Sequence, residues 1–110
     1  MSEVYLIEGF AGDTAKMTSS DEAQGISSAV LDPGNNPIAE VEIFVEDANI
    51  RYAFGVDPVK SGDGKLGALF VDGNIMRIRG YDKIGKFRFI SDVENTPATL
   101  QVMPTYRKEL

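Results

Sequence analysis

Cysteine, histidine and tryptophan are absent from this chain of 110 residues. Without cysteine the protein can form neither disulfide bonds nor thiolate metal sites, so its stability must come from packing or assembly. Without histidine it also lacks the commonest general base and metal ligand. An enzyme would have to work with carboxylates, amines and hydroxyl groups alone. We therefore predict a protein that is not an enzyme and that uses no cofactor or metal ion.

Long apolar runs are also absent. No run approaches the ~20 residues that a helix needs to cross a bilayer. Residues 1–4 have neither the basic nor the apolar region that opens a signal peptide. We therefore expect synthesis in the cytoplasm and no association with a membrane. The length is sufficient for one domain with a buried core, but not for two.

Charge is present but unevenly distributed. The net charge of −6 divides into −9 for residues 1–50 and +3 for residues 51–110. The densest basic group contains Arg77, Arg79, Lys83, Lys86 and Arg88. One interpretation is that acidic and basic strands lie side by side in one sheet and pair across it. The other is that the acidic half of one subunit meets the basic half of a neighbour. Nucleic-acid binding is disfavoured, because phosphate repels a chain that is acidic as a whole.

Short runs of alternating apolar and polar residues fill most of the chain after residue 37, and Gly, Pro, Asp and Asn separate them. A period of two is typical of half-buried strands. The expected strands are residues 27–31, 38–46, 48–54, 68–71, 75–79, 86–90 and 98–106. Residues 80–85 are expected to form a loop, and Pro104 suggests an edge strand or a bulge. The pattern predicts an all-β fold, a single small β-sandwich or jelly-roll-like domain of antiparallel strands.

The beginning of the chain has a different character. Val4, Tyr5, Leu6 and Ile7 form a short apolar run that could be a strand or an anchoring arm. Residues 12–28 have neither the helical nor the strand period and are expected to form a long loop or arm. We therefore divide the chain into an extended N-terminal segment, residues 1–28, and a β-sandwich domain, residues 29–110.

Two motifs have a chemical and a structural interpretation. Residues 62–67 match the pattern G-x-G-x-x-G of dinucleotide-binding folds, but no βαβ unit surrounds them, which favours an inter-strand loop. Asp57, Asp63 and Asp72 could share a calcium ion, but their spacing matches no known calcium loop and favours a role in turns. The aromatic residues leave a further alternative open, a platform that stacks against sugar rings.

Features after residue 49 follow a distinctive order. An apolar-Arg-Tyr strand is followed by an Asp-Pro loop, a glycine-rich loop and a short apolar strand. A strand that ends in Phe-Arg-Phe-Ile and a strand of the form Ala-x-Leu-x-Val complete the order. These segments are residues 50–52, 57–58, 62–67, 68–71, 84–90 and 98–102, followed by Tyr106. This order resembles a family of small structural proteins from the virions of tailed bacteriophages.

The resemblance implies a capsid-associated protein on the exterior of the virion, made in the host cytoplasm. Its partners would be the major capsid protein, neighbouring copies of itself, or both. We expect contacts through loops, strand edges and the N-terminal arm, with the apolar run at residues 4–7 and the basic group at residues 77–88 as interaction sites. The alternative function is a carbohydrate-binding β-sandwich module that is displayed on a particle or cell surface and binds a glycan.

Overall fold

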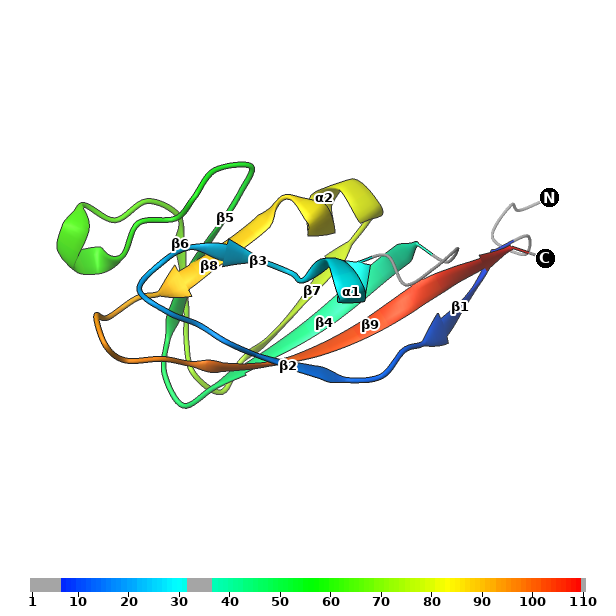
Figure 1. The fold of residues 1–110 in the computed structure, drawn as a ribbon, viewed down its shortest axis with the longest axis horizontal. Helices are drawn as coiled ribbons and strands as arrows, with labels where there is room; N and C mark the ends of the chain where they lie inside the picture. Colours follow the sequence, from blue (N-terminus) through cyan, green and yellow to red (C-terminus); the bar gives the residue numbers. More distant parts are fainter. Residues whose placement is uncertain (1–6, 32–36, 110) are drawn as a thin grey trace.

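The computed structural model describes residues 7–31 and 37–109, and within them two antiparallel sheets pack face to face (Figure 1). The first sheet has the order β1-β9-β4-β7, and β2 also pairs with β9; the second has the order β3-β8-β5-β6. The strands are β1 (Ile7–Ala11), β2 (Ala15–Thr18), β3 (Gln24–Gly25), β4 (Ile38–Glu46), β5 (Ile50–Phe54), β6 (Ala68–Phe70), β7 (Ile75–Arg79), β8 (Phe87–Ser91) and β9 (Thr99–Glu109). The predicted all-β sandwich is confirmed.

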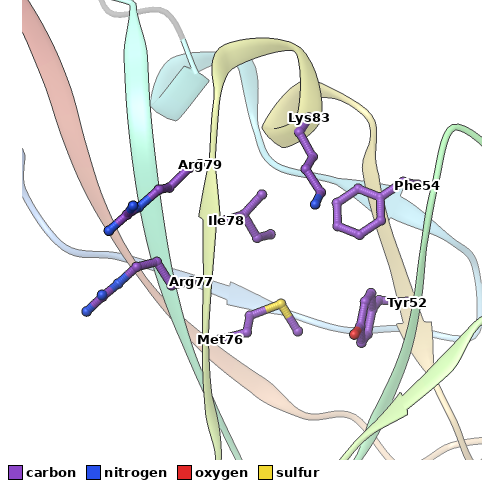
Figure 2. A pocket seen from close by; sticks show the side chains of 7 residues that line it. All are labelled: Tyr52, Phe54, Met76, Arg77, Ile78, Arg79 and Lys83. Carbon is purple, nitrogen blue, oxygen red and sulfur yellow. The ribbon is translucent and has the colours of Figure 1, made fainter.

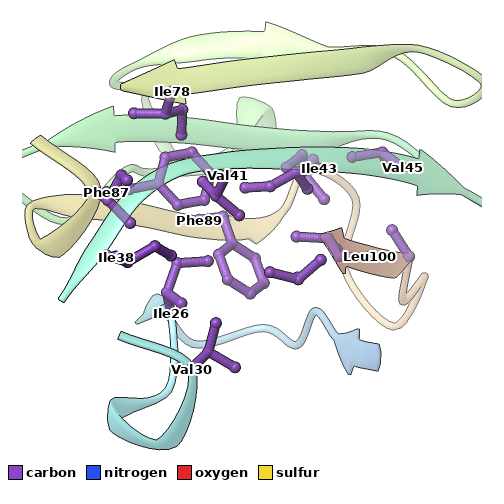
Figure 3. Close-up of a cluster of buried hydrophobic side chains, with 14 of the residues drawn as sticks. Ile26, Val30, Ile38, Val41, Ile43, Val45, Ile78, Phe87, Phe89 and Leu100 are labelled. Atoms are coloured by element: carbon purple, nitrogen blue, oxygen red, sulfur yellow. The ribbon is translucent and has the colours of Figure 1, made fainter. Parts of the chain in front are cut away.

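The core lies between the two sheets, and alternation in the strands builds it. Along β4 the apolar residues at every second position face inward, and Val41 and Ile43 are completely buried. Phe87 and Phe89 of β8 meet them from the other sheet, with ring centroids 5.8 Å apart (Figure 3). Because side chains alternate between the two faces of a strand, the period of two seen in the sequence marks the buried face correctly.

Pro104 lies inside a strand with neighbours on both sides. Its carbonyl accepts a hydrogen bond from the Gly12 N–H (3.0 Å), in the gap between β1 and β2. Because the N–H and C=O of one residue point to the same neighbour in an antiparallel ladder, the missing donor of Pro104 faces this gap. Since β4 pairs with β9 on one side and β1 and β2 pair with it on the other, β9 is not an edge strand. A register shift between Ile38 and Glu40 of β4 lies close by.

Two short helices replace segments predicted to be a strand and a loop. The expected strand at residues 27–31 is instead the single-turn helix α1 (Ser28–Leu31), in which Val30 is buried. The expected loop at residues 80–85 contains α2 (Tyr81–Gly85), which buries Ile84 completely. Helices this short contain too few residues to show the helical period, so the sequence pattern could not identify them.

Residues 12–28, expected to form a long loop or arm, contain two short strands that belong to the two sheets. β2 pairs with β9, and β3 pairs with β8. These strands are only four and two residues long, so their alternation is too brief to recognise, and their partners are distant in the sequence. Val4, Tyr5 and Leu6 lie outside the described residues, and Ile7 begins β1. The role of the N-terminal residues as an arm stays a prediction.

A buried hydrogen bond connects α1 to the first sheet. The Tyr106 hydroxyl on β9 donates to the Val30 carbonyl at 2.6 Å. Burial, with a further contribution from the charge of Asp13, raises the pKa of Tyr106, so the hydroxyl keeps its proton and remains a donor. This bond ties α1, which follows β3 in the chain, to the last strand of the first sheet.

We expect the substitution Tyr106→Phe to lower the free energy of unfolding by about 1 kcal/mol, because it leaves the buried Val30 carbonyl without this donor. Urea denaturation at pH 7 measures the change. Tyr81→Phe is the matched control, since the Tyr81 side chain is exposed. Equal effects of the two substitutions would contradict the role given to the Tyr106 hydroxyl.

Candidate interaction surface

The basic strand β7 lies beside the acidic strand β4, and the charges pair across the ladder. Arg79 is opposite Glu40, and Arg77 is opposite Glu42. The Arg77 Nη2 donates to Glu42 Oε2 at 2.6 Å, and the Arg79 Nε donates to Glu40 Oε1 at 2.9 Å. The hydrogen bond with Glu42 and the charges of Glu42 and Glu40 raise the pKa of Arg77. Pairing of opposite charges within one sheet, the first of the two interpretations, is confirmed.

The other side of β7 has no strand beside it among the described residues. Asn74 and Gly80, at the two ends of β7, hydrogen-bond to β4 through the Asn74 carbonyl and the Gly80 N–H. Because alternate residues of an antiparallel strand bond to the same neighbour, the backbone groups of Ile75, Arg77 and Arg79 point away from β4. β7 therefore presents a free strand edge.

An open groove of about 390 Å³ runs along this edge, between the two sheets (Figure 2). Met76 and Ile78 of β7 form one wall, and Tyr52 and Phe54 of β5 form the other. β6 pairs with β5 only from Ile50 to Tyr52, so the end of β5 has no neighbour on this side in the described structure. The seam between the sheets is open for this reason.

Lys83 closes one end of the groove from α2. Its Nζ lies 5.2 Å from the centroid of the Phe54 ring, in a cation–π arrangement. The side chains of Arg77 and Arg79 point away from the groove, toward β4. The groove thus has apolar side chains on both walls, and the cation at its end and the two arginines along its outer margin make a large part of its lining polar.

The aromatic rings beside the groove pack mainly against one another. Tyr52 meets Phe54 and Phe70 edge to face, with ring centroids 6.0 and 6.1 Å away, and Phe87 in a tilted arrangement at 5.8 Å. Lys83 lies over Phe54. These contacts cover part of the Tyr52 and Phe54 rings, and Phe54 remains 36% exposed.

The two remaining basic residues of the sequence cluster lie elsewhere. Arg88 on β8 donates from Nε to Asp57 Oδ1 at 2.8 Å, and Lys86 pairs with Asp82 at 3.3 Å. Both border a separate hollow of about 250 Å³, together with Gly55 and neighbouring residues. The fold therefore brings Arg77, Arg79 and Lys83 together at the β7 groove and places Lys86 and Arg88 at another site.

A buried ion pair between Arg51 and Asp92 in the second sheet was not predicted from the sequence. Arg51 is only 7% exposed, and its Nε donates to Asp92 Oδ1 at 2.8 Å. Its other nitrogens donate to the Gly67 carbonyl and to Ser61 Oγ, and the Ser61 N–H and hydroxyl donate to Asp92. In the sequence Arg51 occupies the polar position of an alternating strand, and nothing local indicates that a loop will cover it.

The charge state of Asp92 follows from these contacts. Burial alone would raise the pKa of its carboxyl, but the hydrogen bonds from Arg51 and Ser61 and the charge of Arg51 together outweigh burial. The pKa of Asp92 therefore lies below its ordinary value. The network fixes the loop of residues 55–67 over the outer face of the second sheet.

The glycine-rich motif belongs to this loop, as the inter-strand interpretation predicted. The 3₁₀ helix η2 (Ser61–Asp63) precedes Gly64, and a single bridge joins Val59 to Leu66. Gly67 has a φ of +104°, and its carbonyl accepts the bond from Arg51. The motif makes a turn that returns the chain to β6.

The three loop aspartates have separate surroundings. Asp72 Oδ1 accepts a hydrogen bond from the Asp47 N–H at 3.1 Å, and Asp57 pairs with Arg88. Within residues 7–31 and 37–109, no group of three acidic side chains is placed to hold a metal ion. No helix among the described residues is long and apolar enough to span a bilayer.

Comparison with known proteins found no family model, no curated protein and no solved structure that matches this chain.

Proposed function

We propose that the protein is a non-enzymatic structural component of a tailed-phage particle that binds the exterior of the capsid and stabilises the shell. The observation that carries this proposal is the free edge of β7 beside a groove with apolar walls and a cationic margin, because exposed strand edges are ready sites for pairing with another chain. The phage particle itself is inferred from the order of strand and loop motifs between residues 50 and 106.

The chemistry of the groove supports a binding role. The described residues that line it include no carboxylate, and the amine of Lys83 lies over the Phe54 ring. The neighbouring carboxylates, Glu40 and Glu42, are engaged by arginines on the outer face of the first sheet. A symmetric shell presents the same contact many times, so a small protein with a free strand edge suits such a particle.

Particles that lack the protein provide the test. Particles purified from a phage with the gene deleted are mixed with purified protein, and co-sedimentation measures binding. We expect saturable binding and retention of DNA to a higher temperature than in untreated particles. No co-sedimentation, or binding without saturation, would contradict the proposal.

A truncation tests the proposed arm in the same assay. Because β1 begins at Ile7 and pairs with β9, the deletion is confined to residues 2–6. We expect weaker particle binding with an unchanged melting temperature. Undiminished binding would exclude these residues from the contact.

A further inference from the structure

The free edge of β7 specifies what can pair with it. The backbone groups of Ile75, Arg77 and Arg79 point outward, and an extended segment could hydrogen-bond to them as a new strand of the first sheet. One face of such a strand would lie over the groove, and the other would continue the outer face of the sheet. The two faces would meet different chemistry.

On the groove side, the added strand would meet apolar side chains. Met76 and Ile78 lie on one wall, opposite Tyr52 and Phe54. Side chains that enter this space lose contact with water, so the groove favours apolar residues at alternate positions.

On the outer side, the added strand would lie beside Arg77 and Arg79. Their side chains remain 54% and 75% exposed, although each already pairs with a glutamate of β4 on the other side. Carboxylates at the alternate positions of a new strand would flank the arginines from the open side. The protein already contains this arrangement, since β4 has Glu40 and Glu42 outside and Val41 and Ile43 inside.

A second copy of β7 is a poor occupant of the same edge. Antiparallel pairing of two β7 strands would bring the arginines of one copy close to those of the other, and like charges on adjacent strands repel. The charge pattern therefore favours a different, acidic segment.

We infer that β7 binds an extended segment of a partner protein with alternating acidic and apolar residues. The apolar residues enter the groove, and the acidic residues lie beside Arg77 and Arg79. This inference deepens the proposed function, on which it rests only in taking the partner to be a shell protein. Binding of such a segment to β7 is a property of the isolated protein, so it can be measured without particles.

Two fluorescent peptides test the inference on the full-length protein. One alternates three glutamates with three valines, and its control has lysines in place of the glutamates. By fluorescence polarisation we expect the acidic peptide to bind at least tenfold more tightly at low salt. Amide NMR shifts should map to residues 75–79, Phe54 and Lys83. Equal binding of the two peptides, no binding, or shifts at another edge would overturn the inference.

Matched variants distinguish a specific effect of the β7 arginines on peptide binding from a general effect of positive charge. We expect the double substitution Arg77→Gln and Arg79→Gln to weaken the acidic peptide at least tenfold. Arg88→Gln removes an arginine that pairs on the other sheet and should leave binding unchanged. Equal losses of peptide affinity in the two variants would overturn the role of β7. If the double variant fails to fold, the comparison of the acidic and basic peptides decides whether β7 prefers acidic residues.

Other occupants would give distinct results. Saturable binding of a glycan with shifts in the groove, without peptide binding, would overturn the inference in favour of a sugar site. Self-association that blocks the peptide would overturn it in favour of a second copy. Peptide binding without particle binding would instead refute the proposed function and leave the inference standing.

Discussion

Replacing Asp92 by asparagine should lower the free energy of unfolding by about 3–5 kcal/mol, the range found when one partner of a buried ion pair is removed. The Asp92 and Arg51 side chains are each only 9% exposed, so the substitution leaves a guanidinium without its counter-ion and with little water. A domain of this size is stable by about 5–15 kcal/mol. The variant should therefore lose a large share of its stability.

Urea denaturation at pH 7 measures this loss. Asp57→Asn is the matched control, because Asp57 also pairs with an arginine, at 2.8 Å, but its side chain is 66% exposed. Exposed pairs contribute about 0–1 kcal/mol. Similar losses in the two variants would show that the Arg51 network does not hold the loop.

The same carboxylate predicts how stability depends on pH. The pKa of Asp92 in the folded protein lies below 3.8, its ordinary value in an unfolded chain, so the folded state binds the proton less tightly. Its contribution is complete above this ordinary value and is lost as the pH falls through the folded pKa. Between pH 5 and 2 we expect the wild-type protein to lose more stability than Asp92→Asn. Parallel curves of stability against pH for the two proteins would contradict the lowered pKa of Asp92.

Substitution of Gly67 by alanine is the second change expected to have a large effect. Gly67 has a φ of +104°, where an L-residue costs about 1–2 kcal/mol. Its new Cβ would also overlap the Tyr52 carbonyl oxygen of β5. Overpacking of this kind adds about 1–3 kcal/mol. We therefore expect a total loss of about 2–5 kcal/mol, measured as a lower urea midpoint with an unchanged slope.

Two other glycines of the same motif separate the causes. Gly64 has a similarly positive φ but open space around it, so Gly64→Ala should show only the conformational cost. Gly62 has open space and no such φ, so Gly62→Ala should be nearly neutral. An equal effect at all three positions would contradict the close approach of Gly67 to β5.

The sequence predicted the parts of the fold that repeat over several residues. The alternation in β4, β8 and β9 identified their buried faces, because each strand carries several apolar residues at a period of two. α1 and α2 have four and five residues, about one helical turn each, and β2 and β3 have four and two, so none of them shows the period of its own element. Their structure depends on partners that are distant in the sequence.

The sequence predicted the basic residues of the candidate site but not the groove beside them. Arg77, Arg79 and Lys83 belonged to a visible basic cluster, and pairing of acidic with basic strands in one sheet was one of the two interpretations of the charge distribution. The groove could not be predicted, because it exists only where β7 and β5 from different sheets leave their seam open. Burial of Arg51 likewise depends on a loop that folds over the strand from outside.

The central claim, that the protein works as part of a phage shell, is tested most directly by its copy number in particles. Gradient-purified particles from cells that carry the gene are analysed by quantitative mass spectrometry against the major capsid protein. We predict a fixed ratio set by the symmetry of the shell, unchanged by further purification. A protein that is absent from particles and remains in the soluble fraction of the lysate would contradict the account.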